Sequence, residues 1–476
     1  MSKTYDVIIV GSGPNGIAAG ITLQKAGLST LIIEGRDTVG GGMRTADLIE
    51  PGYRHDICSA IHPMALASPF FTALDLRTHG LEFIFTKYQA AHPFDDGSSA
   101  FLSRSISETA EGLGLDRKVY RDLIDPIVSE WDYIASATMG PFEFPKRPLL
   151  LAKFGLQALK PAATMVNKFK ETHTRGLWAG MSAHAIQPFT NIASSAIGLI
   201  LSAVGHKYGW PIPKGGSQAI ADALVSLYTS LGGELKLNYF VENIDELAPY
   251  NTVMFDLTPK QILKIAGHRL STAYKKKLES YRYGMGVFKM DFIIDGEIPF
   301  LDERCGDAAT VHLGNTYEEI AAAESLTSKG GYPEKPFVML AQQSKFDNSR
   351  APAGKNTVWA YCHVPNGSIR DVSVAVENQI ERFAPGFKER ITAKSTMNTA
   401  QLEAYNPNYI GGDINGGIID IRQLFTRPTV QLRPYRTSNQ QIYICSSSTP
   451  PGGGVHGMCG YHAAKTVLKD RFNILL

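Results

Sequence analysis

The sequence predicts an α/β fold with two domains, and three observations support this prediction. The chain opens with a short apolar, β-branched run at Tyr5–Val10, a helical pattern at Ile17–Ala26 and a second strand at Ser29–Ile33. This order is that of a βαβ unit with parallel strands. Strands and helices of the same kind return near the middle and at the end of the chain, with a helix-rich and a β-rich stretch between them. We therefore expect the first domain to be discontinuous.

Length and composition are those of a globular protein. The chain has 476 residues, of which 44% are hydrophobic and 19% charged. It can bury a large core, and disorder, collagen and coiled coil are excluded as descriptions of the whole chain. Lysine and arginine total 47 against 45 aspartate and glutamate residues, and the net charge of +2 gives no electrostatic case for a nucleic-acid partner.

The five cysteines lie far apart and form no CxxC pair, which argues against a disulfide framework and a structural zinc site. We expect no metal site elsewhere either, because no other residues have metal-ligand spacing. The N-terminal apolar run is too short for a signal peptide. These features predict a protein of the reducing cytoplasm.

The other elements follow from local patterns. Residues 35–60 are rich in glycine and polar residues and are predicted to be loop. The stretch 76–206 is predicted to be mostly helical, with helices at Ile106–Leu113 and Val119–Ala137. Further helices are predicted at 218–231, 373–384 and 457–470, and further strands at 235–239, 252–255, 286–294, 337–342, 357–363 and 441–445.

The stretch Gly176–His206 contains no charged residue and is long enough to span a bilayer. It also contains many polar side chains, including Ser182, His184 and Asn191. This polarity favours a buried wall that lines a cavity over a membrane span.

A glycine loop follows the first strand and opens the first helix. Its sequence is Gly11-Ser12-Gly13-Pro14-Asn15-Gly16, and Glu34 ends the next strand 18 residues after Gly16. Gly11 permits a tight turn, Gly13 lets the backbone approach a pyrophosphate, and Gly16 lets the helix pack close to the strand. Glu34 can accept hydrogen bonds from a ribose diol. These features predict a dinucleotide site of the Rossmann type, with NAD and FAD both open.

A second glycine cluster, Gly40-Gly41-Gly42-Met43-Arg44, follows Glu34. The run Asp6–Thr45 resembles the opening of the flavoprotein amine oxidase and phytoene desaturase superfamily. In that superfamily a glycine doublet and a basic residue at this place contact the FAD diphosphate and flavin, so the resemblance favours FAD over NAD.

The resemblance continues through Pro51–Pro63, Gly209–Ser217 and Tyr443–Gly457. These segments look like the chain that passes the flavin, the crossover into the FAD domain and the terminal flavin motif. The most similar branch is the phytoene dehydrogenase-like one, which includes pyridine nucleotide-disulfide oxidoreductase domain-containing protein 2. A glycine loop entering a helix, as at 452–457, offers N–H groups that would stabilise reduced flavin.

The resemblance implies noncovalent FAD, because no family signature links Cys58 or Cys459 to a flavin. It also implies a Rossmann-type FAD-binding domain formed by 1–75, 207–280 and 425–476, and an α+β substrate-binding domain formed by 76–206 and 281–424. The implied cofactor-binding residues are Gly11, Gly13, Pro14, Asn15, Gly16, Glu34, Gly35, Arg36, Gly40, Gly41, Gly42, Met43, Arg44, Ala60, Ile61, His62, Val241, Gly453, Gly454, Val455 and His456.

The implied activity is FAD-dependent oxidation or desaturation of a hydrophobic, isoprenoid- or carotenoid-like substrate, with oxygen or a quinone as electron acceptor. A polyene saturase or isomerase is one alternative. Amine oxidation is another, although no aromatic cage or lysine near the flavin can be located in the sequence. A flavin-free lipid-binding module similar to Rab GDP-dissociation inhibitor is the non-enzyme alternative.

Histidines are the candidates for acid–base work. His62 and His456 rank first, since their segments are expected at the flavin, ahead of His55, His184, His206 and His363. A basic stretch at 144–170 carries lysines interleaved with leucines and no acid after Glu143. This pattern predicts a peripheral membrane contact, with a solvated helix as the alternative.

Overall fold

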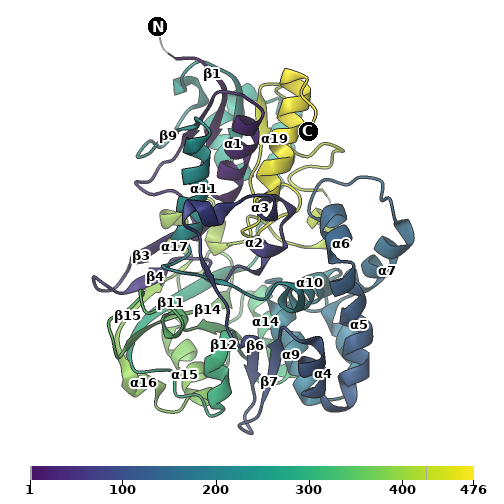
Figure 1. The fold of residues 1–476 in the computed structure, drawn as a ribbon, viewed down its shortest axis with the longest axis vertical. Coiled ribbons are helices and arrows are strands. Elements are labelled where there is room, and N and C mark those ends of the chain that lie inside the picture. Colours follow the sequence, from purple (N-terminus) through teal and green to yellow (C-terminus); the bar gives the residue numbers. More distant parts are fainter. Residues whose placement is uncertain (1–2, 425) are drawn as a thin grey trace.

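A computed structural model describes residues 3–424 and 426–476, so the predicted domain boundary at residue 425 falls outside the described residues. Two sheets organise the chain, one in the upper and one in the lower half of Figure 1. A group of helices lies beside the second sheet (Figure 1).

The first sheet has five parallel strands in the order β16-β10-β1-β2-β9. Its strands are β1 (Tyr5–Val10), β2 (Thr30–Ile33), β9 (Glu234–Lys236), β10 (Tyr250–Phe255) and β16 (Ile442–Ile444). Buried parallel strands are typically continuous apolar runs, and β1, β2 and β16 fit this pattern. These strands come from the three segments that the sequence assigns to the first domain, whose boundaries stay a prediction.

Three long helices pack with this sheet: α1 (Pro14–Lys25), α11 (Gln218–Ser230) and α19 (Met458–Phe472) (Figure 1). α1 and α19 are in close contact because Gly460 has no side chain. A Cβ at Gly460 would lie 1.8 Å from the Asn15 carbonyl oxygen. The last helix of the chain, α19, therefore packs directly against the first helix, α1.

The second sheet has seven strands in the order β15-β11-β14-β13-β12-β6-β7, antiparallel except for the β12–β6 pair. The strands are β6 (Tyr88–Pro93), β7 (Ser99–Ser103), β11 (Gly286–Asp295), β12 (Ala308–Leu313), β13 (Val338–Ala341), β14 (Lys355–Val364) and β15 (Ile391–Met397). Two small ribbons join β3 (Thr45–Asp47) to β4 (Arg54–Asp56) and β5 (Phe83–Ile84) to β8 (Ile212–Pro213).

Helices cluster beside β6 and β7 (Figure 1). They are α4 (Ile106–Glu111), α5 (Arg117–Ser129), α6 (Trp131–Thr138), α7 (Pro148–Ala158), α8 (Ala162–Met165), α9 (Thr172–Ala183), α10 (Ser194–Lys207) and α14 (Tyr317–Ser328). The other helices are α2 (Pro63–Ala67), α3 (Pro69–Thr72), α12 (Pro259–Ala266), α13 (Thr272–Glu279), α15 (Ser373–Phe383), α16 (Phe387–Arg390), α17 (Thr399–Tyr405) and α18 (Ile421–Leu424).

The stretch 76–206 is mostly helical, as predicted, and it also contributes β6 and β7 to the large sheet and β5 to a ribbon. Two other sequence predictions need correction. Residues 35–60 are not all loop, because they include the β3–β4 ribbon. The predicted helix Val119–Ala137 is two helices, α5 and α6, separated at Glu130. The uncharged stretch 176–206 forms much of α9 and α10, and no helix in the described part of the chain is long and apolar enough to cross a membrane.

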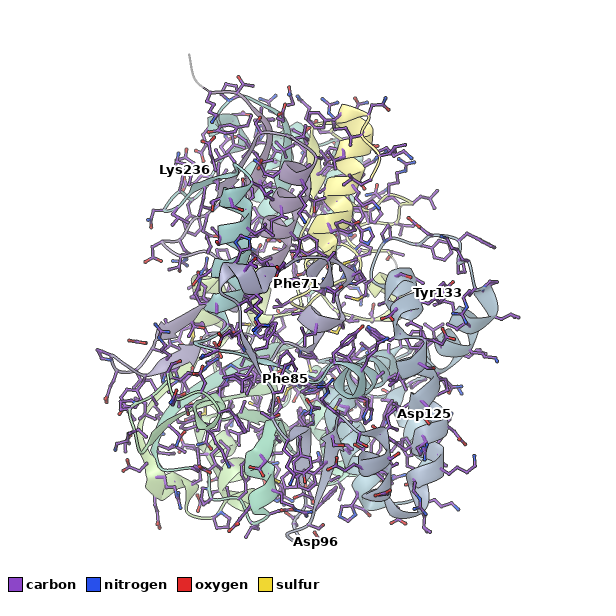
Figure 2. All side chains as sticks on the ribbon, viewed as in Figure 1. Phe71, Phe85, Asp96, Asp125, Tyr133 and Lys236 are labelled. Atoms are coloured by element: carbon purple, nitrogen blue, oxygen red, sulfur yellow. The ribbon has the colours of Figure 1, made fainter. Side chains whose placement is uncertain are left out.

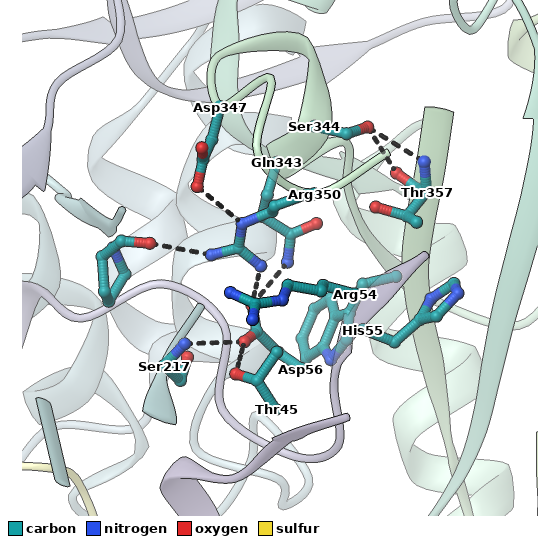
Figure 3. A network of polar contacts seen from close by, with 12 residues as sticks. Thr45, Arg54, His55, Asp56, Ser217, Gln343, Ser344, Asp347, Arg350 and Thr357 are labelled. Atoms are coloured by element: carbon teal, nitrogen blue, oxygen red, sulfur yellow. Dashed lines mark hydrogen bonds and ion pairs between the residues drawn. The ribbon is translucent and has the colours of Figure 1, made fainter. Parts of the chain in front are cut away.

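A buried ion-pair network connects the β3–β4 ribbon to the second sheet (Figure 3). Arg350 donates to Asp56 at 2.7 Å and to Asp347 at 3.2 Å. Asp56 also accepts from the backbone N–H of Ser217 and from the Thr45 hydroxyl. Burial alone would raise the pKa of Asp56, but the Arg350 charge and these hydrogen bonds lower it below its usual value. The network joins the segments that lead into and out of the first domain.

Candidate functional site

A cavity of about 450 Å³ runs from the glycine loop to the second sheet. This volume falls within the 300–1,000 Å³ range of ligand and cofactor sites. Among the predicted residues, those that line it are Gly11, Gly13, Pro14, Asn15, Glu34, Gly35, Arg36, Gly41, Gly42, Arg44, Ala60, Ile61, Val241, Gly454 and Val455. The fold thus brings together segments that are more than 400 residues apart in the sequence.

The glycine loop lies between β1 and α1 and is shaped by three glycines. Gly11 has a φ of +103°, which favours glycine. A Cβ on Gly13 would lie 2.5 Å from the Asp256 carboxylate, and one on Gly16 would lie 2.2 Å from the Gly11 carbonyl. Gly13 precedes the helix with Pro14 at its first position, so the N–H groups of the first turn of α1 have no helical partners.

The second glycine cluster packs directly on this loop. Gly40 donates its N–H to the Ser12 carbonyl at 2.9 Å, and a Cβ on Gly41 would lie 3.1 Å from the Gly13 Cα. Gly42 faces Tyr409, whose hydroxyl would be 2.7 Å from an added Cβ. The two glycine clusters therefore form one continuous backbone surface. The two loops can pack this closely only because glycine has no side chain.

Glu34 is at the end of β2 and is already well bonded. Its carboxylate accepts from the Ser12 N–H and hydroxyl and from the Arg36 N–H, and it pairs with Arg44 at 3.1 Å. These contacts use its two oxygens almost fully. A ribose diol could bind Glu34 only by displacing the Ser12 hydroxyl or Arg44.

Asp256 directly follows β10 and was not singled out from the sequence. Its carboxylate lines the cavity and accepts from the Gly16 N–H at 2.9 Å. Burial, with a smaller contribution from the Glu34 charge, raises the pKa of Asp256 to about 7. The available signal was its position at the carboxyl end of a strand next to β1, where α/β sheets bind ligands.

Six predicted residues lie behind the cavity wall. They are Gly16, Gly40, Met43, His62, Gly453 and His456, none of which is among the lining residues of the described chain. Gly16 and Gly40 shape the loops through the contacts above, and Met43 is completely buried. A Cβ on Gly453 would lie 2.9 Å from the Asn415 carbonyl oxygen.

The two histidines predicted to do acid–base work are buried and make hydrogen bonds within the protein. The Nε2 of His62 is 2.8 Å from the Ser217 hydroxyl, which itself donates to Ser59. In His456, Nδ1 accepts from the Met458 N–H and Nε2 contacts the Gly452 carbonyl. Burial lowers the pKa of each to about 4. Their catalytic role stays a prediction from sequence with no geometric counterpart.

The inner end of the cavity lies against the second sheet and is mainly aromatic and apolar. Its lining includes Leu201, Trp210, Met339, Trp359 and Tyr361, with Tyr405 and Tyr409 nearer the glycine clusters. Aromatic side chains that the sequence could not locate therefore do meet at the site. Of the uncharged stretch 176–206, only His184 and Leu201 are lining residues in the described chain, which narrows the predicted cavity wall to two side chains.

The aromatic wall is joined to the glycine clusters by hydrogen bonds. The Trp359 indole N–H donates to the Cys58 carbonyl at 3.0 Å, and the Ser59 hydroxyl donates to the Gly42 carbonyl at 2.8 Å. A buried lysine, Lys289, is paired with Asp291 on β11 and is not among the lining residues of the described chain. No group of metal-ligating side chains is found among residues 3–424 and 426–476.

Comparison with known proteins agrees with this geometry. Residues 9–72 match a family model described as an NAD(P)-binding Rossmann-like domain. Over its full length the chain is 24% identical to pyridine nucleotide-disulfide oxidoreductase domain-containing protein 2 of Mus musculus, covering 95% of that protein. It is 25% identical to the lycopene-forming phytoene desaturase of a Paracoccus species, with 95% of each chain covered.

A solved structure with the same fold is a redesigned putrescine oxidase. Its TM-score is 0.61, it is 17% identical, and 99% of each chain is covered. This likeness shows the Rossmann-type α/β fold that the sequence predicts. Together with the full-length relatives, it confirms the recognition made from the glycine motifs: the chain is an oxidoreductase that is similar to phytoene desaturases over nearly its whole length and shares its fold with putrescine oxidase.

Proposed function

We propose that this chain is an FAD-dependent oxidoreductase that desaturates or oxidises a hydrophobic, isoprenoid- or carotenoid-like substrate. One observation carries the proposal. A single cavity is lined at one end by the two glycine clusters, which pack against each other, and at its inner end by aromatic and apolar side chains. The full-length relatives include desaturases of phytoene, which supports a substrate of this class.

The residues present fit a dinucleotide cofactor. The backbone of Gly13 and Gly41 forms a cradle that a Cβ would fill, and the start of α1 offers the Asn15 N–H and the positive end of the helix dipole to a diphosphate. Asn15 Oδ1 and Arg36 Nε are buried without partners in the described chain, so polar groups are left for a ligand. Arg44 lies beside Glu34 and adds positive charge at the cavity wall.

When bound, the flavin would supply the hydride-accepting chemistry. The chain's own residues would bind and orient the cofactor and the substrate. Ala60, Ile61 and Trp359 would form a wall that holds the substrate against the cofactor and excludes water, while the loop at 452–457 offers backbone donors from the other side. Oxygen or a quinone is the proposed electron acceptor.

The first experiment is the visible absorption spectrum of the purified protein, followed by anaerobic mixing with carotenoid, retinoid and amine candidates. Flavin bands would support the cofactor. Bleaching by a polyene would support desaturation, while polyene conversion without bleaching would indicate an isomerase. Reoxidation of chemically reduced protein by a polyene would indicate a saturase. A colourless protein that cannot be reconstituted with FAD would refute the proposal and favour a lipid-binding module.

Amine oxidation is a second candidate because aromatic side chains line the cavity and a putrescine oxidase shares the fold. Trp359 and Tyr361 meet edge to face, with ring centroids 5.0 Å apart. Aromatic faces attract cations, including protonated amines. Bleaching by an amine and not by any polyene would select this candidate over desaturation.

We also propose a peripheral membrane contact around α7. Its neighbourhood exposes Phe142, Phe144, Leu149 and Leu156, and Lys146 and Lys153 are exposed among them. α6, on which Figure 2 labels Tyr133, lies beside it, because the Arg147 N–H donates to the Tyr133 hydroxyl. Such a mixture suits an anionic lipid interface.

The membrane contact is tested by flotation with vesicles of phosphatidylcholine, with and without phosphatidylglycerol. We expect the parent protein to float with the anionic vesicles. The double variant Phe144→Ser/Leu149→Ser should lose this binding, and the control Leu301→Ser, which changes an exposed leucine on another segment, should keep it. Equal flotation of all three proteins would refute the contact.

A further inference from the structure

A pair of histidines forms part of the wall at the inner end of the cavity. His184 directly follows α9, and His312 is on β12. Their Nε2 atoms are 2.9 Å apart, and their rings meet at 72°. His312 is completely buried, whereas His184 is partly exposed and lines the cavity. Among the described residues, His184 is the one histidine that does so.

Both rings are neutral near pH 7. Burial lowers the pKa of His184 to about 3, and burial also lowers the pKa of His312 well below its usual value. A neutral imidazole carries a single N–H, on either Nδ1 or Nε2. The short contact between the two Nε2 atoms therefore contains one hydrogen, which belongs to one of the two rings.

The surroundings of His312 decide which ring donates. Its Nδ1 is buried and has no hydrogen-bond partner in the described chain. A Cβ on Gly180 would lie 2.6 Å from this atom, so a Gly180 C–H points at it. If Nδ1 of His312 carries no hydrogen, it can accept a weak hydrogen bond from the Gly180 C–H. If Nδ1 carried a hydrogen, that hydrogen would clash with the Gly180 hydrogen, and the N–H would remain a buried donor without a partner. The hydrogen of His312 is therefore on Nε2, and it is donated to Nε2 of His184.

The tautomer of His184 follows from this donation. Because its Nε2 accepts, its own hydrogen is on Nδ1, and no group in the described chain accepts that hydrogen. Two other donors nearby are already used. The Trp210 indole N–H bonds to the Leu201 carbonyl, and the Tyr361 hydroxyl bonds to the Met339 sulfur. His184 thus supplies a free N–H in a mainly apolar part of the cavity, which the Thr310 side chain also lines.

We propose that the substrate carries an oxygen, as a hydroxyl, carbonyl or ether, which accepts a hydrogen bond from Nδ1 of His184. His312 is a positioning residue that fixes the tautomer of His184. A pure hydrocarbon would leave the His184 donor buried and unpaired, and the site would discriminate against it. This inference rests on the proposed function and narrows its substrate class to oxygenated isoprenoids.

The test compares farnesol with farnesene, two C15 isoprenoids that differ by a hydroxyl group, by calorimetric titration of the purified protein. We expect farnesol to bind roughly 5- to 150-fold more tightly, the range of a buried donor that gains or loses its partner. In His184→Leu this ratio should fall to about one. The matched control Leu201→Met changes an apolar side chain of the same wall and should keep the ratio, because only the backbone carbonyl of Leu201 bonds to Trp210.

Two variants of His312 test its positioning role. In His312→Gln the side-chain amide can still donate to His184, so the preference for farnesol should persist. In His312→Leu it should be lost. Nitrogen-15 NMR of histidine-labelled protein gives a readout without any ligand, and we expect His184 in the Nδ1–H form in the parent and in His312→Gln.

An Nε2–H form of His184 in the parent would overturn the inference. So would equal affinities for the two probes, including no measurable binding of either, or a farnesol preference that survives in His184→Leu. These results are independent of the cofactor. A protein with flavin bands but equal affinities refutes only the oxygen contact, whereas failure to bind FAD refutes the proposed function.

Discussion

Replacing Asp256 with asparagine should stabilise the cofactor-free protein at alkaline pH and not at acid pH. The folded-state pKa of Asp256 is about 7, against an ordinary value of 3.8, because burial disfavours the carboxylate. Between pH 4 and pH 7 the folded protein therefore holds a proton that the unfolded chain releases. Stability falls as pH rises through this window, and the loss is complete above pH 7.

The size of the effect follows from the pKa difference. A shift of about 3 units corresponds to roughly 4 kcal/mol. Asp256 lines the cavity and is partly reached by water, so screening reduces this figure, and we expect about 2 kcal/mol. Asparagine stays neutral at every pH, and its amide oxygen can still accept the Gly16 N–H. The Asp256→Asn variant should therefore not lose stability as the pH rises.

The assay is the thermal midpoint of the flavin-free protein between pH 4.5 and pH 8.5, for the parent and Asp256→Asn. The midpoint difference should be close to zero at pH 4.5. At pH 8.5 the variant should be more stable by roughly 2 °C if the whole chain unfolds together, and by more if one domain unfolds alone. The control Asp37→Asn changes an exposed carboxylate and should show no such trend. A midpoint difference that does not change with pH would refute the reasoning.

Three further substitutions test the site and its support. Gly13→Val should abolish FAD retention because its side chain meets Asp256, while Gly155→Ala, which has open space, should keep the parent flavin-to-protein absorbance ratio; full occupancy in Gly13→Val would contradict the phosphate loop. Glu34→Ala should weaken FAD by about 1.5–3 kcal/mol, and an unchanged Kd by titration would remove Glu34 from the ribose role. Arg350→Met leaves Asp56 buried without its ion pair and should cost about 3–5 kcal/mol, seen as a lower thermal midpoint; a parent-like midpoint would show that the network does not carry this energy.

The first sheet and its glycine loop could be predicted because their signals are local. The strands β1, β2 and β16 are short, mainly apolar runs, and the loop needs glycine at fixed spacing for backbone reasons alone. The Tyr5–Val10 strand and the Gly11–Gly16 loop are therefore visible without any tertiary information.

The strands β6 and β7 escaped prediction because their pattern is broken by buried polar side chains. Gln89 accepts from the Trp210 backbone N–H, and His92 contacts the Asn315 carbonyl. Distant segments bond to Gln89 Oε1 and His92 Nε2, so nothing near Gln89 or His92 in the sequence indicates burial. Long-range contacts decided this part of the fold.

The cavity wall was hidden for a similar reason. Trp359, Tyr405 and Tyr409 come from segments without any motif, and only the folded chain brings them into the cavity that Gly42 also lines. The histidine candidates show that closeness in sequence does not fix where a side chain points. His62 and His456 are near the right loops in sequence, but their rings face hydrogen-bond partners inside the wall.

The packing of α19 on α1 has a consequence for how this protein is made. The ribosome completes α1 early, but the helix that covers it, and the edge strand β16, emerge last. At 5–20 residues per second, the apolar face of α1 waits roughly 20–90 s for its partner. A chain that stops before residue 440 lacks both elements and leaves the first sheet without its edge strand. Premature termination near the C-terminus should therefore prevent the protein from folding, even though no residue of α19 lines the cavity in the described chain.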